Sequence, residues 1–303
     1  MPHEVHQSRR LRLPEGIDPV LTLSELWHGP ADPHLRFEGS TVSRAGRTPD
    51  GPASVRLAFD GSDVRAEAWG PGADWTLEAL PDLLGARDDP SLLQPRHRLI
   101  AELVRRLPGL RMPRTAAVMD VLVPTVLGQK VTSLEADRAY RALVRRYGEP
   151  APGPLHLSIP PAPQTLARLP YYELHPLGIE RRRADVLRLA ARAATQLEAI
   201  VGLPPAEGRR RLESLPGVGP WTAAETTRLA LGDPDAVSVG DYHLPTLVTF
   251  ALAGERRGDD ARMLELLEPY RGQRARVIRL LEMSGLHPPR RGPRMAPRSI
   301  AAI

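Results

Sequence analysis

Hydrophobic and polar positions alternate with a period of two in the early part of the chain. The alternation runs through residues 54–59 and again through residues 64–69, and the Asp-Gly-Ser-Asp stretch at residues 60–63 has the composition of a hairpin turn. A rough helical pattern at residues 20–27 interrupts the early strands. We therefore expect residues 1 to about 90 to form a β-rich unit that includes one helix.

From Arg98 onward the hydrophobic positions recur with the period of an amphipathic helix, and no strand pattern interrupts them. The expected helices cover residues 98–107, 115–127, 131–147, 181–199, 206–213, 220–231, 243–253, 260–268 and 271–284. Two proline-rich stretches, 150–154 and 159–163, bracket a long loop, which we interpret as a stiff connection rather than a domain boundary.

The change of period predicts an α+β fold class. We expect a small N-terminal antiparallel sheet domain (residues 1–92), a mostly α-helical domain (residues 93–287) and a basic, proline-rich tail (residues 288–303). A chain of 303 residues is long enough to bury a sizeable core in one large domain or two smaller ones.

Composition narrows the possible chemistry. The formal net charge is +5 and the pI is about 10.0, which suits a polyanionic partner but also describes an ordinary basic protein. No apolar run approaches the roughly 20 residues of a membrane span, and residues 1–6 do not resemble a signal peptide. The sequence therefore predicts a soluble, cytoplasmic protein without membrane partners.

Two residue types are absent or nearly absent. The chain has no cysteine, which excludes disulfides, thiolate nucleophiles and cysteine-ligated zinc or iron–sulfur sites. Lys130 is the only lysine, and covalent chemistry through a Schiff base requires a lysine amine.

The most specific local pattern is Leu-Pro-Gly-Val-Gly at residues 215–219, between two predicted helices. Gly217 and Gly219 suit unusual dihedral angles and leave the backbone without Cβ atoms where a phosphate has to come close. The free N–H groups at the start of the following helix favour an anion. The pattern is typical of a hairpin that binds a phosphate backbone.

This hairpin, with Asp241 placed just after the next helix, resembles the helix-hairpin-helix superfamily of DNA glycosylases, and most of all the 3-methyladenine DNA glycosylase II type. The resemblance covers roughly residues 95–285. It implies the α+β fold predicted above, a monomer, and damaged double-stranded DNA as the partner. The hairpin residues implied to bind DNA are Gly217, Val218, Gly219 and Thr222.

Asp241 is the implied catalytic residue. Hydrolysis of an N-glycosidic bond passes through a sugar with oxocarbenium character, which a nearby carboxylate stabilises. Taken alone, Asp241 would be interpreted as the cap of the helix that begins near His243. Asp241 lies at the position, relative to the hairpin, where this superfamily has its aspartate, so the resemblance favours the catalytic interpretation.

Trp221 occupies the position at which bifunctional members of the superfamily carry a lysine that attacks the sugar. The resemblance therefore implies base removal by water, without lyase activity. The expected base pocket contains Trp221, Tyr242 and Glu225, because a flipped base stacks on aromatic faces. Trp221 as an anchor of the hairpin is an equal alternative. Glu225 stands where relatives often have tyrosine, so it either favours a cationic base or is an exposed helix residue.

Gln129 and Lys130 lie between the predicted helices that end near Leu127 and begin at Val131, where the family inserts a wedge into the minor groove. In one interpretation Lys130 contacts phosphate while Gln129 fills the gap left by the flipped base. In the other, the segment is an ordinary polar loop.

The family also binds a monovalent cation through hairpin carbonyl groups. The matching positions are Glu213, Leu215 and Val218. These contacts use the main chain, and no organic cofactor is required.

The resemblance implies a monofunctional DNA glycosylase of base-excision repair that acts on flipped alkylated purines such as 3-methyladenine and 7-methylguanine, and that associates with the nucleoid when bound to DNA. Glu225 and Arg279 leave open a pocket for an etheno, deaminated or oxidised base. A catalytically silent helix-hairpin-helix DNA-binding protein is a further alternative. An all-helical scaffold without DNA leaves the two glycines unexplained.

Overall fold

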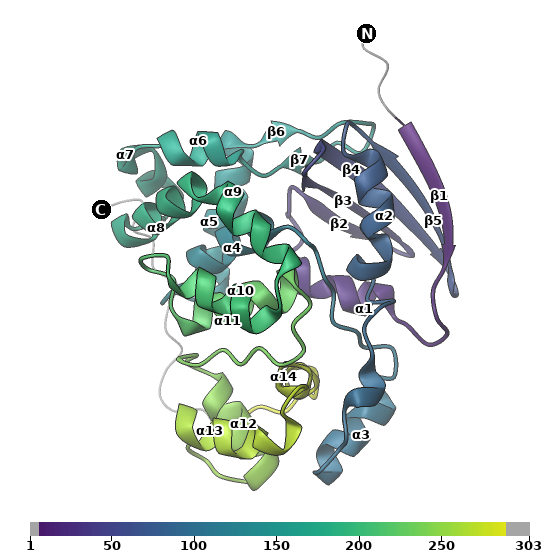
Figure 1. Cartoon of the computed structure of the whole chain (residues 1–303), viewed down its shortest axis with the longest axis vertical. Coiled ribbons are helices and arrows are strands. Elements are labelled where there is room, and N and C mark those ends of the chain that lie inside the picture. The colour runs from purple at the N-terminus through teal and green to yellow at the C-terminus, as the bar shows by residue number, and fades with distance from the viewer. Residues whose placement is uncertain (1–5, 289–303) are drawn as a thin grey trace.

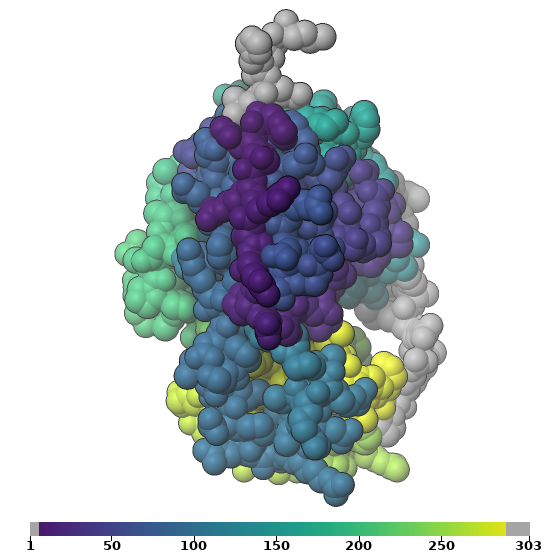
Figure 2. Space-filling model, turned by 90° about the vertical axis from the view of Figure 1, so that its right-hand side faces the viewer, coloured from purple at the N-terminus to yellow at the C-terminus, as the bar shows by residue number. Residues whose placement is uncertain are grey.

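The predicted alternation corresponds to strands β4 (Gly51–Asp60) and β5 (Asp63–Trp69) in the computed structural model, which describes residues 6–288. Three further strands complete a five-stranded antiparallel sheet in the order β1-β5-β4-β3-β2. These are β1 (His6–Arg12), β2 (Leu35–Glu38) and β3 (Thr41–Thr48). β1 is an edge strand of the sheet, and most of its side chains are exposed. In Figure 2 the purple N-terminal residues run down the face turned to the viewer.

Helix α2 (Ala73–Leu83) packs on the sheet through Leu77 and Leu80, against alternate apolar residues of β4 and β5 (Figure 1). This helix was not predicted from the sequence, and it contains Pro81, a residue that disfavours helix interiors. The predicted helix at residues 20–27 is confirmed in two pieces. They are α1 (Pro19–Leu23) and the 3₁₀ turn η1 (Ser24–Leu26).

The long helical patterns are confirmed, with ends that shift by a few residues. The helices are α3 (Arg98–Arg106), α4 (Val118–Leu127), α5 (Ser133–Tyr147), α8 (Arg181–Arg192), α9 (Ala194–Glu198), α10 (Pro205–Glu213), α11 (Pro220–Ala230), α12 (Leu244–Ala253), α13 (Asp260–Leu267) and α14 (Arg274–Glu282). The single helix expected at residues 181–199 is divided between α8 and α9, which meet at Ala193.

The expectation that no strand interrupts the helices was wrong. Strands β6 (Glu149–Pro150) and β7 (Ser158–Ile159) pair within the proline-rich loop. The loop residues Leu155 and Leu157 pack against Trp69 of β5, so hydrophobic burial holds this connection to the sheet. Several short elements connect the longer ones. They are the helices α6 (Pro163–Arg168) and α7 (Tyr171–Leu174) and the 3₁₀ turns η2 (Pro90–Leu92), η3 (His175–Leu177), η4 (Ala199–Gly202) and η5 (Glu268–Tyr270).

The helices pack around two hydrophobic cores. One core joins α4 and α5 to α8 through α11, and the other joins α3 to α12 through α14 (Figure 1). The chain passes from the first hydrophobic core to the second in the segment between α11 and α12. The predicted domain boundaries near residues 92 and 287 stay predictions, and residues 289–303 of the predicted tail lie outside the described part. Within residues 6–288, no helix has the length and apolar character needed to span a membrane.

A buried ionic cluster makes the stability of the N-terminal unit depend on pH. Asp32 accepts hydrogen bonds from the backbone N–H and Nδ1 of His34 and from the backbone N–H of His28. Burial acts to raise the pKa of Asp32, but the charge and hydrogen bonds of His34 and the His28 amide outweigh burial and lower the pKa from 3.8 to about 2. A carboxylate with a lowered pKa contributes stability above its unfolded pKa and loses it as the pH falls towards the folded value.

We expect the difference in unfolding free energy between the wild type and Asp32→Asn to shrink by about 2 kcal/mol as the pH falls from 5 to 2. Urea unfolding followed by circular dichroism at several pH values measures this difference. Parallel pH curves for the two proteins would contradict the assignment.

Candidate functional site

The hairpin between α10 and α11 is anchored by its apolar residues and exposes its glycines. The side chain of Val218 is buried in the same core as Leu212, so only the main chain of Val218 is available to a ligand. Gly217 has a φ of +88°, and a Cβ atom at this position would lie 2.3 Å from Cγ2 of Val186 in α8. Gly217 is therefore required by both backbone conformation and packing.

Gly219 does not have the unusual dihedral angles that were expected for both glycines of the hairpin. Its φ is −99° and its ψ is −177°, which any residue adopts, and a Cβ atom would meet no other atom within 4 Å. The fold itself does not need glycine here. No hydrogen bond within residues 6–288 uses the backbone N–H of Gly217 or Gly219, so both amides are available for an anion.

Gln129 links the predicted wedge loop to the hairpin. Its Nε2 donates to the carbonyl oxygen of Gly217 at 3.0 Å and to Oγ1 of Thr222 at 2.9 Å. The side chain of Thr222 is buried, so any contact of Thr222 with DNA has to use its main chain. Because both hydrogen bonds would break if Gln129 left this position, Gln129 is poorly placed to fill a gap in DNA.

Lys130 is the exposed residue at the tip of the same loop. Its φ of +57° lies in the left-handed region, which a lysine rarely adopts. Lys130 lies three residues after the end of α4, and its side chain is exposed with no partner among the described residues. Of the two predicted wedge residues, Lys130 is the one that is free to contact DNA.

Trp221 and Asp241 are in direct contact. The indole Nε1 of Trp221 donates to Oδ2 of Asp241 at 2.9 Å. Oδ1 of Asp241 accepts from the backbone N–H groups of His243 at 2.7 Å and Leu244 at 2.9 Å, at the start of α12. Asp241 thus caps the turn that leads into α12 from two residues before His243, the N-cap residue, which makes no side-chain cap bond of its own. The second carboxylate oxygen of Asp241 faces α11.

The Trp221 ring also lies on the end of α4, because a Cβ atom on Gly128 would be 3.4 Å from the ring. The tryptophan therefore connects the wedge loop, the first turn of α11 and Asp241. This packing agrees with an anchoring role, and the stacking role stays a prediction.

Tyr242 is not enclosed with Trp221. Its side chain is 88% exposed and its ring stands edge-on to His243, with 4.9 Å between the ring centroids. Oδ1 of Asp241 accepts hydrogen bonds from the N–H groups of His243 and Leu244. This turn leaves the side chain of the intervening residue, Tyr242, on the outside. The expected pocket of Trp221, Tyr242 and Glu225 is therefore not formed as one enclosed site.

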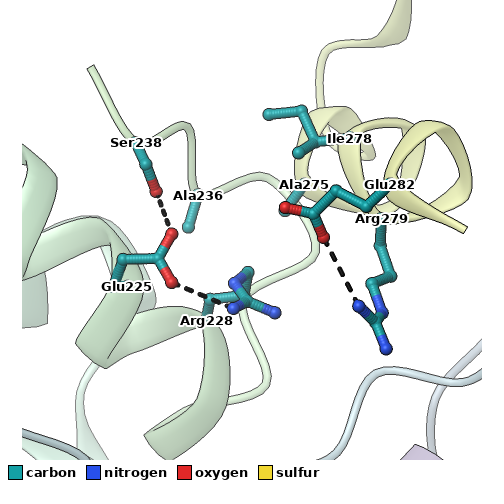
Figure 3. Close-up of a pocket in the computed structure, with 8 residues that line it drawn as sticks. All are labelled: Glu225, Arg228, Ala236, Ser238, Ala275, Ile278, Arg279 and Glu282. Atoms are coloured by element: carbon teal, nitrogen blue, oxygen red, sulfur yellow. Dashed lines mark hydrogen bonds and ion pairs between the residues drawn. The ribbon is translucent and has the colours of Figure 1, made fainter. Parts of the chain in front are cut away.

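Glu225 instead lines a small cavity between α11 and α14, with a volume of about 10 Å³ (Figure 3). One carboxylate oxygen accepts a hydrogen bond from Oγ of Ser238, and the other accepts from Arg228 Nη2 at 3.0 Å. The cavity residues are Glu225, Arg228, Ala236, Ser238, Ala275, Ile278, Arg279 and Glu282. The volume is at the lower limit for one water molecule.

Ser238, Arg228 and Glu25 lie in or beside this cavity, and none of them was predicted from the sequence as a site residue. The spacing of Glu225 and Arg228 on one helix was a usable signal for their ion pair. Glu25 gave no such signal, because it pairs with Arg228 from a position 203 residues away.

The monovalent cation at the carbonyl groups of Glu213, Leu215 and Val218 stays a prediction, and two of these groups have an oxygen lone pair available. The carbonyl oxygen of Leu215 accepts from the Val218 N–H at 3.0 Å and keeps a second lone pair. Pro216, three residues after Glu213, has no N–H to occupy the Glu213 carbonyl. Main-chain oxygens suit a hard cation.

No protein-family model matches the chain. The chain is 34% identical over 170 residues to the probable bifunctional transcriptional activator/DNA repair enzyme AlkA of Mycobacterium tuberculosis, a match that covers 55% of this chain and 32% of the relative. It is 30% identical over 118 residues to DNA-3-methyladenine glycosylase 2 of Escherichia coli, covering 38% of this chain and 42% of the relative. The chain thus spans less than half the length of these relatives.

Two solved structures have similar folds. The 3-methyladenine DNA-glycosylase from Archaeoglobus fulgidus superposes with a TM-score of 0.76 at 18% identity, over 90% of this chain and 96% of the other. The apo form of Clostridium acetobutylicum 8-oxoguanine glycosylase/lyase superposes with a TM-score of 0.71 at 14% identity, over 93% of this chain and 98% of the other. At these identities the likeness concerns the fold.

Proposed function

We propose that the chain is a member of the helix-hairpin-helix DNA glycosylase superfamily, of the 3-methyladenine DNA glycosylase II type, and that it is a DNA glycosylase of base-excision repair for alkylated bases. The observation that carries the proposal is the pair formed by Asp241 and Trp221 beside an exposed hairpin. Among alkylated bases we propose 3-methyladenine and 7-methylguanine as substrates.

The proposed chemistry needs one carboxylate. In alkylated purines the positive charge on the base already weakens the glycosidic bond, so departure of the base needs little protonation. Asp241 then stabilises the positive charge that develops on the sugar and orients the attacking water. Three N–H donors, from Trp221, His243 and Leu244, hold the carboxylate in place before the nucleotide arrives.

The proposed DNA contacts lie on one surface. The amides of Gly217 and Gly219 bind phosphate, with main-chain help from Val218 and Thr222, and Lys130 enters from the wedge loop. Gln129 acts by holding this loop against the hairpin. A monovalent cation at the carbonyls of Glu213, Leu215 and Val218 would neutralise phosphate charge there. The partner is damaged double-stranded DNA, bound by a monomer.

The absence of a lysine at position 221 supports a monofunctional enzyme. The chain's only lysine, Lys130, lies in the wedge loop and not at position 221, where the resemblance places the lysine that attacks the sugar in bifunctional members.

With methylated duplex DNA, we expect the wild type to release 3-methyladenine, measured by chromatography, and strand breaks to appear only after treatment with alkali. Borohydride should trap no protein–DNA adduct, because no Schiff base forms. Breaks without alkali, or a trapped adduct, would contradict the monofunctional mechanism. Tight duplex binding with no base released would favour the silent DNA-binding alternative.

A further inference from the structure

One face of α11 connects Asp241 to the charged cavity. Trp221, Glu225 and Arg228 follow each other at helical spacing, so their side chains lie on the same side of the helix. Trp221 bonds Asp241, and one turn later Glu225 bonds Ser238, whose carbonyl oxygen accepts the N–H of Asp241 at 3.3 Å. The cavity therefore begins one turn of α11 after Trp221, the residue that bonds the proposed catalytic carboxylate.

The N-terminal unit completes this cavity through Glu25. Its side chain is only 2% exposed, although it comes from η1, far from α11 and α14 in the sequence. Glu25 accepts a hydrogen bond from Arg228 Nη1 and faces Nε of Arg279 at 3.0 Å. One buried carboxylate thus fixes an arginine from each of the two helical cores.

The cavity region carries an excess of negative charge. Three carboxylates, those of Glu25, Glu225 and Glu282, face two guanidinium groups, those of Arg228 and Arg279, which leaves one net negative charge. Burial raises the pKa of Glu282, against the charges of Arg228 and Arg279, which act to lower it. In Figure 3 the carboxylates of Glu225 and Glu282 both lie at the cavity.

Resting on the proposed glycosylase function, we infer that Glu225 determines specificity by favouring a flipped base that carries a positive charge, and that Glu25 of the N-terminal unit positions Glu225 through Arg228. A carboxylate only accepts hydrogen bonds, so it suits the N–H edge of a purine whose ring is cationic. Attraction to that charge is strong where water is excluded, and a neutral base gains none of it.

The closed cavity is too small for a base, so entry requires Glu225 to exchange its present partners for the base. The Ser238 hydroxyl rotates freely once released, and Arg228 keeps Glu25 as its counter-charge. Glu225 can therefore release Arg228 without leaving that buried arginine unpaired, because Glu25 still neutralises it. An unpaired buried charge would be costly in free energy.

The test compares duplexes that carry 7-methylguanine, which is cationic, or hypoxanthine, which is neutral, at the same position. Single-turnover rates of base release give a selectivity ratio for each protein. We expect both Glu225→Gln and Glu25→Gln to lower this ratio roughly tenfold relative to the wild type, because each removes the excess negative charge. Glu25→Asp keeps the charge and should restore most of the ratio.

Asp120→Asn is the matched control. Asp120 forms a similarly shielded ion pair with Arg44 at 3.3 Å, which also joins the sheet to a helix, but neither residue lines the cavity. This variant should lose stability without a change in the selectivity ratio. If Glu25→Gln fails to fold, Glu25→Asp and Arg228→Lys carry the positioning claim. Arg228→Lys keeps the charge but lacks the planar guanidinium group that bonds Glu25 and Glu225 together, so a lowered ratio is expected.

Binding separates the two proposals. In an Asp241→Asn background, affinity for the 7-methylguanine duplex relative to the undamaged duplex should fall when Glu225→Gln is added. An unchanged preference, with the wild type still releasing 7-methylguanine, would overturn the specificity role and leave the glycosylase proposal standing. If the wild type releases neither base and Asp241→Asn does not prefer the damaged duplex, the proposed function itself fails.

Discussion

Replacing Asp241 with asparagine is expected to lower the single-turnover rate of base release by roughly 10²- to 10³-fold. Asparagine has nearly the same shape and can still accept the N–H groups of His243 and Leu244, so α12 keeps its cap. It removes the negative charge that would stabilise the developing positive charge on the sugar. Affinity for duplex DNA should stay within a few-fold of the wild type, because the phosphate contacts lie elsewhere.

Asp259→Asn is the matched control for this prediction. Asp259 caps α13 by accepting from the Arg262 N–H at 2.9 Å, so the same exchange is made at a neighbouring helix without touching the candidate site. Base release by this variant should equal that of the wild type. If Asp241→Asn kept release within about threefold of the wild type, the catalytic role of Asp241 would be wrong and its function would be capping alone.

Gly217→Ala is expected to lower the free energy of unfolding by about 3 kcal/mol. Alanine would have to adopt a φ of +88°, and its Cβ atom would lie 2.3 Å from the Val186 side chain. The hairpin would shift to relieve the overlap, which would also move the amides proposed to bind phosphate. Urea unfolding measures the first effect, and fluorescence anisotropy with a labelled duplex measures the second.

Gly219→Ala separates folding from binding. Its backbone conformation suits alanine and its Cβ atom would point into open space, so stability should be unchanged. We expect the added methyl group to hinder a phosphate at the hairpin and to weaken duplex binding roughly tenfold. Equal loss of stability in the two variants would contradict the hairpin geometry, and unchanged affinity of Gly219→Ala would contradict phosphate binding at this amide.

Several elements could be predicted from the sequence because neighbouring residues alone encode them. The helical periods beyond Arg98 correspond to helices, since a helix buries residues that recur every three or four positions. The hairpin was recognisable from adjacent residues, and so was the capping position of Asp241. Strand β1 was not recognised, because most of its side chains are exposed and no alternation marks it.

At the candidate site, local sequence patterns also failed to predict contacts between distant segments. The sequence proposed Gln129 as a wedge, but its amide is bonded to Gly217 and Thr222 from the neighbouring helical hairpin. It proposed Tyr242 as a pocket residue, but the turn capped by Asp241 leaves that ring exposed. Both outcomes depend on how separate segments meet.

By itself, the sequence determined the fold class, the hairpin and the position of one carboxylate after the following helix, because each is encoded by neighbouring residues. Only the tertiary structure decided that Trp221 bonds Asp241 and that Glu25 pairs with Arg228 and Arg279. Glu25 and Arg228 are 203 residues apart, and such pairs form only when separately folded units pack together. Their energy depends on shared burial, which no local pattern of residues records.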